Sequence, residues 1–368
     1  MPVSQELTEP WKTILEYGRY APSPHNMQPW LFQVEEDGTV TLMYDPKRLL
    51  PGTNPTGSFV YVAFGILHET MSIAAASSDN DVEFEYLSDN LTLDSNAIGP
   101  QPLAKIRLVK RTREETLNKQ LIIDRQTSRL PYNSIPVAEE VMDELQAIAA
   151  QYKHKLEYTR DKKEVDWVIR LNADTMFYDM SNAKARNEVA SWMRFTKKDA
   201  LARKDGLAAY AMHVPGPIMW LFAHANWLFR IPFVYYIVRK LYERTMRGTA
   251  IVSWISGPFA TQVDWINAGH MMARLWLTMT KNGVYLHPFG SVITNQEANI
   301  KMTEHFKNPN REHNLWMLTR LGYGEKPPVA QRRSLDDMLV KGNKFSFFSP
   351  SKEEEKTKEQ DMSPKLAS

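Results

Sequence analysis

The chain of 368 residues contains no cysteine. Disulfide bonds, thiolate nucleophiles, iron–sulfur clusters and thiolate zinc sites are therefore excluded. The formal net charge is only +2 at pH 7, so the composition gives no electrostatic indication of a nucleic-acid partner. The first residues, MPVSQELTEPWK, lack a basic stretch followed by an apolar one. We therefore predict no cleaved signal peptide and a cytoplasmic location.

Several motifs of common enzyme classes are also missing. There is no glycine-rich dinucleotide fingerprint, no P-loop, no His-Glu-x-x-His and no Gly-x-Ser-x-Gly. His305 and His313 lie near Glu304 and Glu312, but scattered histidines often give such pairs by chance. We therefore predict no metal site and no serine-hydrolase activity.

The residues that are present predict a globular protein with two long buried helices. Hydrophobic residues make up 43% of the chain and charged residues 24%, which is typical of a protein with a sizeable core. Two long apolar segments, at 59–77 and 264–283, have the spacing and length of buried helices. Each contains a glycine, at Gly65 and Gly269, and each precedes a predicted strand. This weak internal repeat favours a duplicated architecture.

One further segment, residues 215–245, is unusually aromatic. It is close to the roughly 20 residues that a membrane-spanning helix needs. However, polar residues and a proline interrupt its middle, at His224, Asn226, Arg230 and Pro232. An arginine at such a position costs about 2.5–3.5 kcal/mol on insertion. A lid or buried insert is the favoured interpretation, and an interfacial membrane anchor remains a second one.

The segment APSPHNMQPW near the N-terminus combines stiff backbone with amide and hydroxyl groups. Pro22 and Pro24 restrict the backbone. Ser23, Asn26 and Gln28 offer hydrogen-bond donors and acceptors from this framework. Such a set suits a heterocycle or a polyol, but it also suits a turn in which the polar side chains make only local bonds.

Two basic segments offer phosphate-binding chemistry. The segment DRQTSRLPY alternates cations with hydroxyls, at Arg125, Thr127, Ser128 and Arg129. Guanidinium groups bind phosphate through paired, charge-assisted hydrogen bonds. The segment QRRSLDD contributes Arg332 and Arg333 after the last predicted strand. Taken alone, each segment is equally well read as a solvated basic turn.

Together, these segments resemble the nitroreductase superfamily. Its members bind FMN with an Arg-x-Ser/Thr-x-Lys/Arg segment, a Pro-Ser-x-x-Asn-x-Gln-Pro-Trp loop, a glycine near the flavin N5 and a basic pair near the C-terminus. The corresponding segments here are residues 125–129, 22–30, 288–290 and 332–333. The Pro-Trp loop comes before the arginine segment, an order similar to that of the Acg-type branch, in which two nitroreductase-like halves are fused.

The resemblance implies an α+β, nitroreductase-like fold that forms a pseudo-dimer of two related halves. Each half is expected to have a small, mostly antiparallel sheet packed on long buried helices. We assign residues 1–118 to the first half and 119–340 to the second, with an aromatic insert or lid at about 205–260. Residues 341–368 are polar and charged and are predicted to be a disordered tail.

The resemblance also implies the cofactor and its contacts. FMN and an NAD(P)H electron donor are expected, with hydride transfer to the flavin N5 and onward transfer to a nitroaromatic, quinone-like or other small acceptor. The expected cofactor-binding residues are Pro22, Ser23, Asn26, Gln28, Arg125, Thr127, Arg129, Phe289, Gly290, Arg332 and Arg333. The backbone N–H of Gly290 is the candidate donor to N5, and no catalytic side chain is required.

Alternative interpretations remain at this point. The protein could bind FMN under a closed lid and sequester it with little turnover. It could instead be a membrane-surface protein on a degenerate nitroreductase fold, with contact through residues 215–245. For the assembly we expect a monomer containing the internal pseudo-dimer, although a homodimer remains open.

Overall fold

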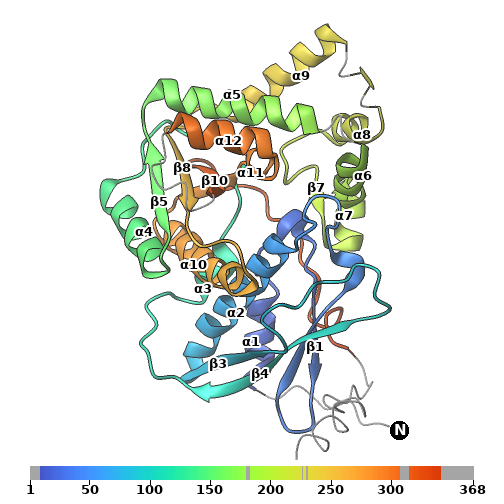
Figure 1. The fold of residues 1–368 in the computed structure, drawn as a ribbon, viewed down its shortest axis with the longest axis vertical. Coiled ribbons are helices and arrows are strands. Elements are labelled where there is room, and N and C mark those ends of the chain that lie inside the picture. The colour runs from blue at the N-terminus through green and yellow to red at the C-terminus, as the bar shows by residue number, and fades with distance from the viewer. Residues whose placement is uncertain (1–8, 180–182, 226, 229–230, 307–314, 341–368) are drawn as a thin grey trace, which may run out of the picture.

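The computed structural model places two sheets around a pair of crossed central helices (Figure 1). The predicted disorder of residues 341–368 lies outside the described residues. The structure describes residues 9–179, 183–225, 227–228, 231–306 and 315–340.

The first sheet is formed by the N-terminal part of the chain. Its strands run in the order β1-β2-β4-β3, and all neighbours are antiparallel. The strands are β1 (Trp30–Val34), β2 (Val40–Tyr44), β3 (Asn80–Tyr86) and β4 (Gln101–Lys110). The predicted hairpin turn at Asp37-Gly38 joins β1 to β2, and Gly38 has the positive φ of 79° that favours glycine.

The second sheet repeats this topology. Its order is β5-β8-β10-β9, again with antiparallel neighbours throughout. The strands are β5 (Lys155–Thr159), β8 (Ile251–Ser256), β9 (Tyr285–Pro288) and β10 (Leu315–Gly322). In both sheets a long helix joins the second strand in the chain to the third: α2 (Ser58–Ala75) in the first and α10 (Gln262–Lys281) in the second. The predicted α+β architecture, with small antiparallel sheets packed on long helices, is confirmed.

The two long helices touch at their glycines. A Cβ atom added to Gly65 would lie 2.1 Å from the carbonyl oxygen of Ile266, and one added to Gly269 would lie 2.3 Å from that of Val62. Real Cβ atoms do not approach backbone oxygens this closely, so only glycine permits the crossing. The glycines noticed in the sequence therefore mark the point where α2 and α10 pack backbone against backbone.

The remaining helices surround this centre. Around the two sheets lie α1 (Trp11–Gly18), α3 (Gln120–Asp124), α4 (Glu139–Gln151), α5 (Lys162–Asp179), α11 (Gly290–Thr294) and α12 (Gln296–His305). Short 3-10 turns occur at η1 (Pro24–Asn26), η2 (Pro46–Arg48) and η3 (Ala76–Ser78). Between β5 and β8 the chain also forms α6 (Ala183–Trp192), β6 (Met193–Arg194), α7 (Lys197–Arg203), β7 (Leu207–Ala208), α8 (Gly216–His224) and α9 (Pro232–Thr245).

The insert predicted at 205–260 extends too far at its C-terminal end. It includes β8, whose residues are all buried and which lies between β5 and β10 inside the second sheet. Glycines flank the run IVSWIS in the sequence, at Gly248 and Gly257, and separate this strand from the aromatic segment before it. The helices that lie outside the sheet in this region are α8 and α9.

The C-terminal part of the chain returns to the first sheet. The backbone N–H of Phe32 in β1 donates to Met338 O at 2.8 Å, and the N–H of Val340 donates to Phe32 O at 2.9 Å. This parallel pairing adds a short segment to the free edge of β1. Residues assigned to the second half thus complete the sheet of the first.

Among the described residues, the helix Ser58–Ser78 is long and apolar enough by composition to cross a membrane. In this structure 83% of its apolar 18-residue stretch is buried inside the protein. It contains α2, the central helix of the fold.

Candidate functional site

The APSPHNMQPW loop holds an unusual backbone conformation. His25, Asn26 and Gln28 all have positive φ angles, of 50°, 54° and 49°. Asparagine tolerates this left-handed region, whereas other non-glycine residues are strained there by about 1–3 kcal/mol each. Such a loop keeps its shape only if its surroundings fix it, and strained segments of this kind concentrate at ligand sites.

Gln28 is the group that fixes the loop. Its side chain is fully buried, and its Oε1 accepts a hydrogen bond from the backbone N–H of Arg333 at 2.8 Å. Its Nε2 donates to Lys204 O at 3.0 Å and to Asn26 O at 3.2 Å. Gln28 therefore joins three segments of the chain. The structure thus gives Gln28 a tethering role, and its predicted contact with a cofactor stays a prediction.

Ser23 and Asn26 also make contacts within the protein. Ser23 Oγ accepts from the backbone N–H of Gln28 at 2.9 Å, which closes the loop on itself. Asn26 Nδ2 donates to Gln331 O at 3.0 Å, and its Oδ1 accepts from Arg332 Nη1 at 2.9 Å. The structure thus brings together the loop and the C-terminal basic pair, as the motifs indicated.

We expect Gln28→Ala to destabilise the protein by about 2–4 kcal/mol, because it leaves buried N–H and C=O groups of Arg333 and Lys204 without partners. Urea unfolding followed by circular dichroism would measure this. Gln120→Ala is the matched control, since that side chain is exposed and bonds only to Asp124. Equal midpoints for the two variants would contradict the tethering role.

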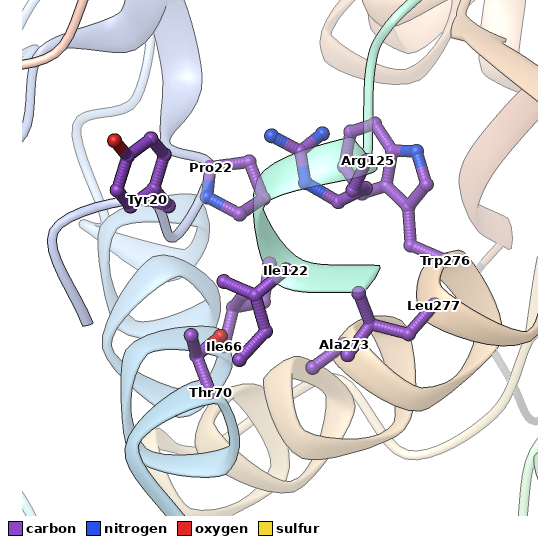
Figure 2. Close-up of a pocket in the computed structure, with 9 residues that line it drawn as sticks. All are labelled: Tyr20, Pro22, Ile66, Thr70, Ile122, Arg125, Ala273, Trp276 and Leu277. Carbon is purple, nitrogen blue, oxygen red and sulfur yellow. The ribbon is translucent and has the colours of Figure 1, made fainter. Parts of the chain in front are cut away.

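Arg125 lies at the end of α3 in a nearly buried position. Its exposed fraction is 7%, and its guanidinium lies 4.5 Å from the ring centroid of Trp276. Figure 2 shows the side chain beside that ring, with its nitrogens on the side of Pro22. Among the described residues no carboxylate is paired with Arg125, and its Nη1 has no hydrogen-bond partner. A buried cation with a free donor is the expected state of an anion site.

Arg332 adds a second cation to this place. Burial, followed by repulsion from Arg332, lowers the pKa of Arg125 to about 9. Burial also lowers the pKa of Arg332 to about 10, and its Nε has no partner in the described part of the chain. A buried guanidinium and a half-buried one, each with an unused donor and with repulsion between their charges, favour a doubly charged oxyanion such as a phosphate.

The other member of the basic pair has a different role. Arg333 donates from its side chain to Asp337 O and to Gln28 O, and the carboxylates of Asp45 and Asp205 lie close enough to act on its charge. Arg332 therefore lies near Arg125, while Arg333 braces the loop, and the predicted phosphate clamp formed by the two stays a prediction.

Arg129 adds a further cation near the loop. Burial lowers its pKa to about 10, and the charge on Arg320 adds to that effect. Burial also lowers the pKa of His25 to about 4, with the charge of Arg129 acting in the same direction. The arginine segment and the Pro-Trp loop are thus electrostatically coupled, and their combined charge is positive.

The remaining predicted residues fall around β9. The backbone of Thr127 forms a parallel bridge with Leu286 of β9. The ring of Phe289 is buried in a cluster with Val165, Val168 and other apolar residues, so its side chain has a core role, and its predicted contact with a cofactor stays a prediction. A Cβ atom added to Gly290 would meet nothing within 4 Å, so its backbone borders open space.

A cavity lies between the loop and the helices α2, α3 and α10 (Figure 2). It is lined by Tyr20, Pro22, Ile66, Thr70, Ile122, Arg125, Ala273, Trp276 and Leu277. The cavity therefore brings together one predicted residue of the Pro-Trp loop, Pro22, and one of the arginine segment, Arg125.

The related position on the other side of the helix crossing is filled. We align α2 and α10 at the two glycines that meet at the crossing, Gly65 and Gly269. In this alignment Ile66 of α2 is equivalent to His270 of α10, Thr70 to Arg274, and Glu69 to Ala273. There, buried Glu69 pairs with Arg274 at 2.5 Å and with His270 at 2.9 Å. Small and apolar cavity residues on one side are thus replaced by an ion-pair network on the other.

Sequence reasoning missed the residues that attach the loop and the neighbouring residues 52–53 to α6–β7. Glu188 of α6 accepts hydrogen bonds from the backbone N–H groups of Gly52 at 2.6 Å and Thr53 at 2.8 Å. The N–H of Gly206 donates to Asn26 O at 3.2 Å. No local pattern marks these residues, because each contact joins segments that are distant in the chain.

Three histidines, of which His287 is buried and His25 and His68 are half-buried, predict a stability that falls as the pH is lowered. Burial lowers the pKa of His25 to about 4, that of His68 to about 3, and that of His287 well below its ordinary value. The unfolded chain therefore binds protons first, so stability is lost as pH falls from about 6.5 towards 4.

Urea unfolding at pH values between about 7 and 5 would measure this loss. Carboxylates such as Glu69, whose pKa is lowered to about 2, contribute only at more acidic pH. A flat unfolding midpoint across the window would contradict the burial of neutral histidines.

Comparisons with known proteins give related sequences. No protein-family model matches the chain. A Mycobacterium tuberculosis protein named NAD(P)H nitroreductase acg is 28% identical over 186 residues, covering 49% of this chain and 54% of that protein. A Serratia protein named NAD(P)H nitroreductase PigM is 22% identical over 320 residues, covering 82% of this chain and 86% of that protein.

Among solved structures, the Mycobacterium smegmatis nitroreductase NfnB, in complex with NADPH, matches 63% of this chain and 97% of its own. Its TM-score is 0.38 and its sequence identity 15%. The chain spans about half the length of the M. tuberculosis relative. The predicted resemblance to NAD(P)H nitroreductases is confirmed by the named relatives.

Proposed function

We propose that this protein is an FMN-dependent NAD(P)H oxidoreductase of nitroreductase type. The observation that carries the proposal is the pair Arg125, which is buried, and Arg332, which is half-buried, each with a donor atom that no described residue uses. Arg125 also lines the cavity beside Pro22 of the loop, and the two motifs to which these residues belong resemble those of an FMN site. The curated relatives, both named NAD(P)H nitroreductases, support the electron donor.

The residues present fit FMN. Arg125 and Arg332 supply charge and free N–H donors for its phosphate, and open space at Gly290 leaves room for a flat ring against the backbone. The backbone N–H of Gly290 is the candidate donor to N5. Trp276 orients Arg125 from its ring face, and Gln28 holds the loop in its strained shape.

When bound, FMN supplies the redox chemistry, taking hydride from NAD(P)H and passing electrons to a nitroaromatic, quinone-like or other small acceptor. The protein's part is to bind and orient the cofactor. The ion-pair network around Glu69 fills the related position, so we expect one FMN per chain. We also propose that the chain consists of two fused halves, is monomeric and is located in the cytoplasm.

The first experiment is the visible absorption spectrum of the purified protein after incubation with FMN and desalting. A retained flavin spectrum near one equivalent per chain is expected. Anaerobic stopped-flow mixing with NADH and with NADPH should then bleach it. A colourless protein would overturn the proposal, and bound flavin that stays oxidised under both donors would overturn its enzymatic part.

Sequestration of FMN under a lid is a second candidate, favoured by the contacts of residues 204–210. Tyr210 Oη donates to Val329 O at 3.2 Å and accepts from Gln331 Nε2 at 3.2 Å. This segment thus contacts the loop and the irregular chain segment 329–333, which contains Arg332. If it restricts access, Tyr210→Ala should speed flavin reduction several-fold, whereas an unchanged rate would argue against a lid.

A further inference from the structure

Arg320 places a cation deep inside the second sheet. It lies in β10 and is fully buried. Its Nη2 donates to Leu130 O at 2.9 Å, and its Nη1 donates to Thr249 Oγ1 at 3.2 Å. Its Nε donates to Nδ1 of His287, across from it in β9, at 3.1 Å. A cation buried on neutral acceptors is costly, so its presence indicates a positioning role for the groups that it holds.

The bond from Arg320 fixes the protonation of His287. Every nitrogen of a guanidinium is a donor, so Nδ1 of His287 must be the acceptor. An imidazole that accepts at Nδ1 is neutral and carries its proton on Nε2. Burial, together with the charges of Arg320 and Arg129, lowers the pKa of His287 well below its ordinary value, in agreement with a neutral ring. His287 therefore has one N–H donor, at Nε2.

This donor is not used within the part of the chain that the structure describes. His287 is only 7% exposed, and no described residue accepts a hydrogen bond from its Nε2. Buried N–H groups in folded proteins nearly always have a partner. A donor that is held in one tautomer and left without a partner, on a residue buried to more than nine tenths, indicates a ligand that accepts its hydrogen bond.

Strand β9 places His287 beside the candidate cofactor site. The backbone N–H of Ser128, in the arginine segment, donates to Leu286 O at 3.2 Å, so this segment and β9 lie side by side. Just after β9 the chain reaches Gly290, whose backbone borders open space. His287 thus lies between the arginine segment and the glycine at which the flat ring of FMN is proposed to lie.

We propose that His287 donates a hydrogen bond from Nε2 to an acceptor atom of the flavin ring, and that Arg320 is the positioning residue that holds it in this tautomer. The contact depends on the proposed FMN-binding function. Arg125 and Arg332 are assigned to the phosphate, which leaves the ring for a donor on β9. The carbonyl oxygens and ring nitrogens of a flavin gain negative charge on reduction, so a fixed donor binds the reduced ring more tightly than the oxidised one.

Two substitutions separate the bond to Arg320 from the bond to the ligand. In His287→Asn the amide oxygen can replace Nδ1 as acceptor, but the donor at Nε2 is lost. In His287→Gln, the matched control, the longer side chain can place an N–H where Nε2 stood. We expect His287→Asn to lose about tenfold in its preference for reduced over oxidised FMN, which lowers the midpoint potential of the bound flavin by about 30 mV. His287→Gln should keep the potential of the unchanged protein.

Reductive titration of the FMN-loaded protein against a reference dye measures these potentials. An unchanged potential in His287→Asn, or an equal fall in both variants, would overturn the contact. A protein that retains no flavin would overturn the proposed function as well, so the two failures are distinguishable.

Nitrogen NMR of the cofactor-free protein, labelled with 15N-histidine, tests the positioning role without flavin. His287 should appear as the neutral Nε2–H tautomer in the unchanged protein, and Arg320→Met should lose this fixed state. A protonated or Nδ1–H ring in the unchanged protein would contradict the role of Arg320. If Arg320→Met does not fold, the spectrum of the unchanged protein and the two His287 variants still decide the proposal.

Discussion

Replacing Arg125 with methionine is expected to weaken FMN binding about ten- to a hundredfold and to raise the stability of the cofactor-free protein. The lost charge-assisted hydrogen bonds to phosphate account for roughly 1.5–3 kcal/mol. The gain in stability follows because burial and Arg332 both oppose the charge on Arg125. Methionine retains most of the packing against Trp276.

Two measurements on the same samples check this result. Fluorescence titration gives the FMN dissociation constant, and thermal unfolding without FMN gives the stability. Arg107→Met is the control, because Arg107 is an exposed cation paired with Glu85 on the first sheet; neither quantity should change beyond a small loss. Unchanged FMN affinity in Arg125→Met would show that the phosphate site has been misplaced. A lower stability of cofactor-free Arg125→Met than of the unchanged protein would show that the buried charge of Arg125 does not destabilise the fold.

Replacing Gly65 with valine is expected to destabilise the protein by about 3 kcal/mol or more and to abolish FMN retention. The new Cβ would lie 2.1 Å from the carbonyl oxygen of Ile266. This oxygen is part of the backbone of α10, so it cannot move away by a side-chain rotation. Helices α2 and α10 would have to separate, and overpacking of this kind is among the most destabilising single changes. Ile66 and Ala273, which line the cavity, would move apart with them.

Chemical unfolding of the cofactor-free protein measures the first part of this expectation, and flavin retention after desalting measures the second. Gly290→Ala is the matched control for unfolding, since its Cβ would meet nothing within 4 Å. A free energy of unfolding for Gly65→Val within about 1 kcal/mol of that of the unchanged protein would mean that the two helices can separate at the crossing without a large loss of stability.

Much of the architecture could be predicted from local patterns. The Asp37-Gly38 hairpin, the two long helices and the distinctive glycines follow from turn chemistry, apolar spacing and length. The contact between Asn26 and Arg332 was indicated by the Pro-Trp loop and the C-terminal basic pair, because the family that they resemble uses both motifs in one cofactor site. These predictions succeeded because each depends on a short stretch of sequence or on a known combination of stretches.

The division of labour among the site residues could not be predicted. The sequence shows that Gln28 has an amide, but not that Arg333 and Lys204 use it. It shows two adjacent arginines, but not that one is braced by protein carbonyls while the other lies near Arg125. Hydrogen-bond partners of this kind are set by contacts between distant segments, and no periodicity encodes them.

The segment at 338–340 has a consequence for the order in which the protein can be completed. It closes the edge of β1, at Phe32, with residues that are synthesised long after that strand. The first sheet therefore remains open at one edge until residues 338–340 have been made, and an unpaired edge is a template for association with other chains. Closing a contact over such a long separation is also slow. The nascent chain is thus expected to depend on chaperones until this segment has paired with β1.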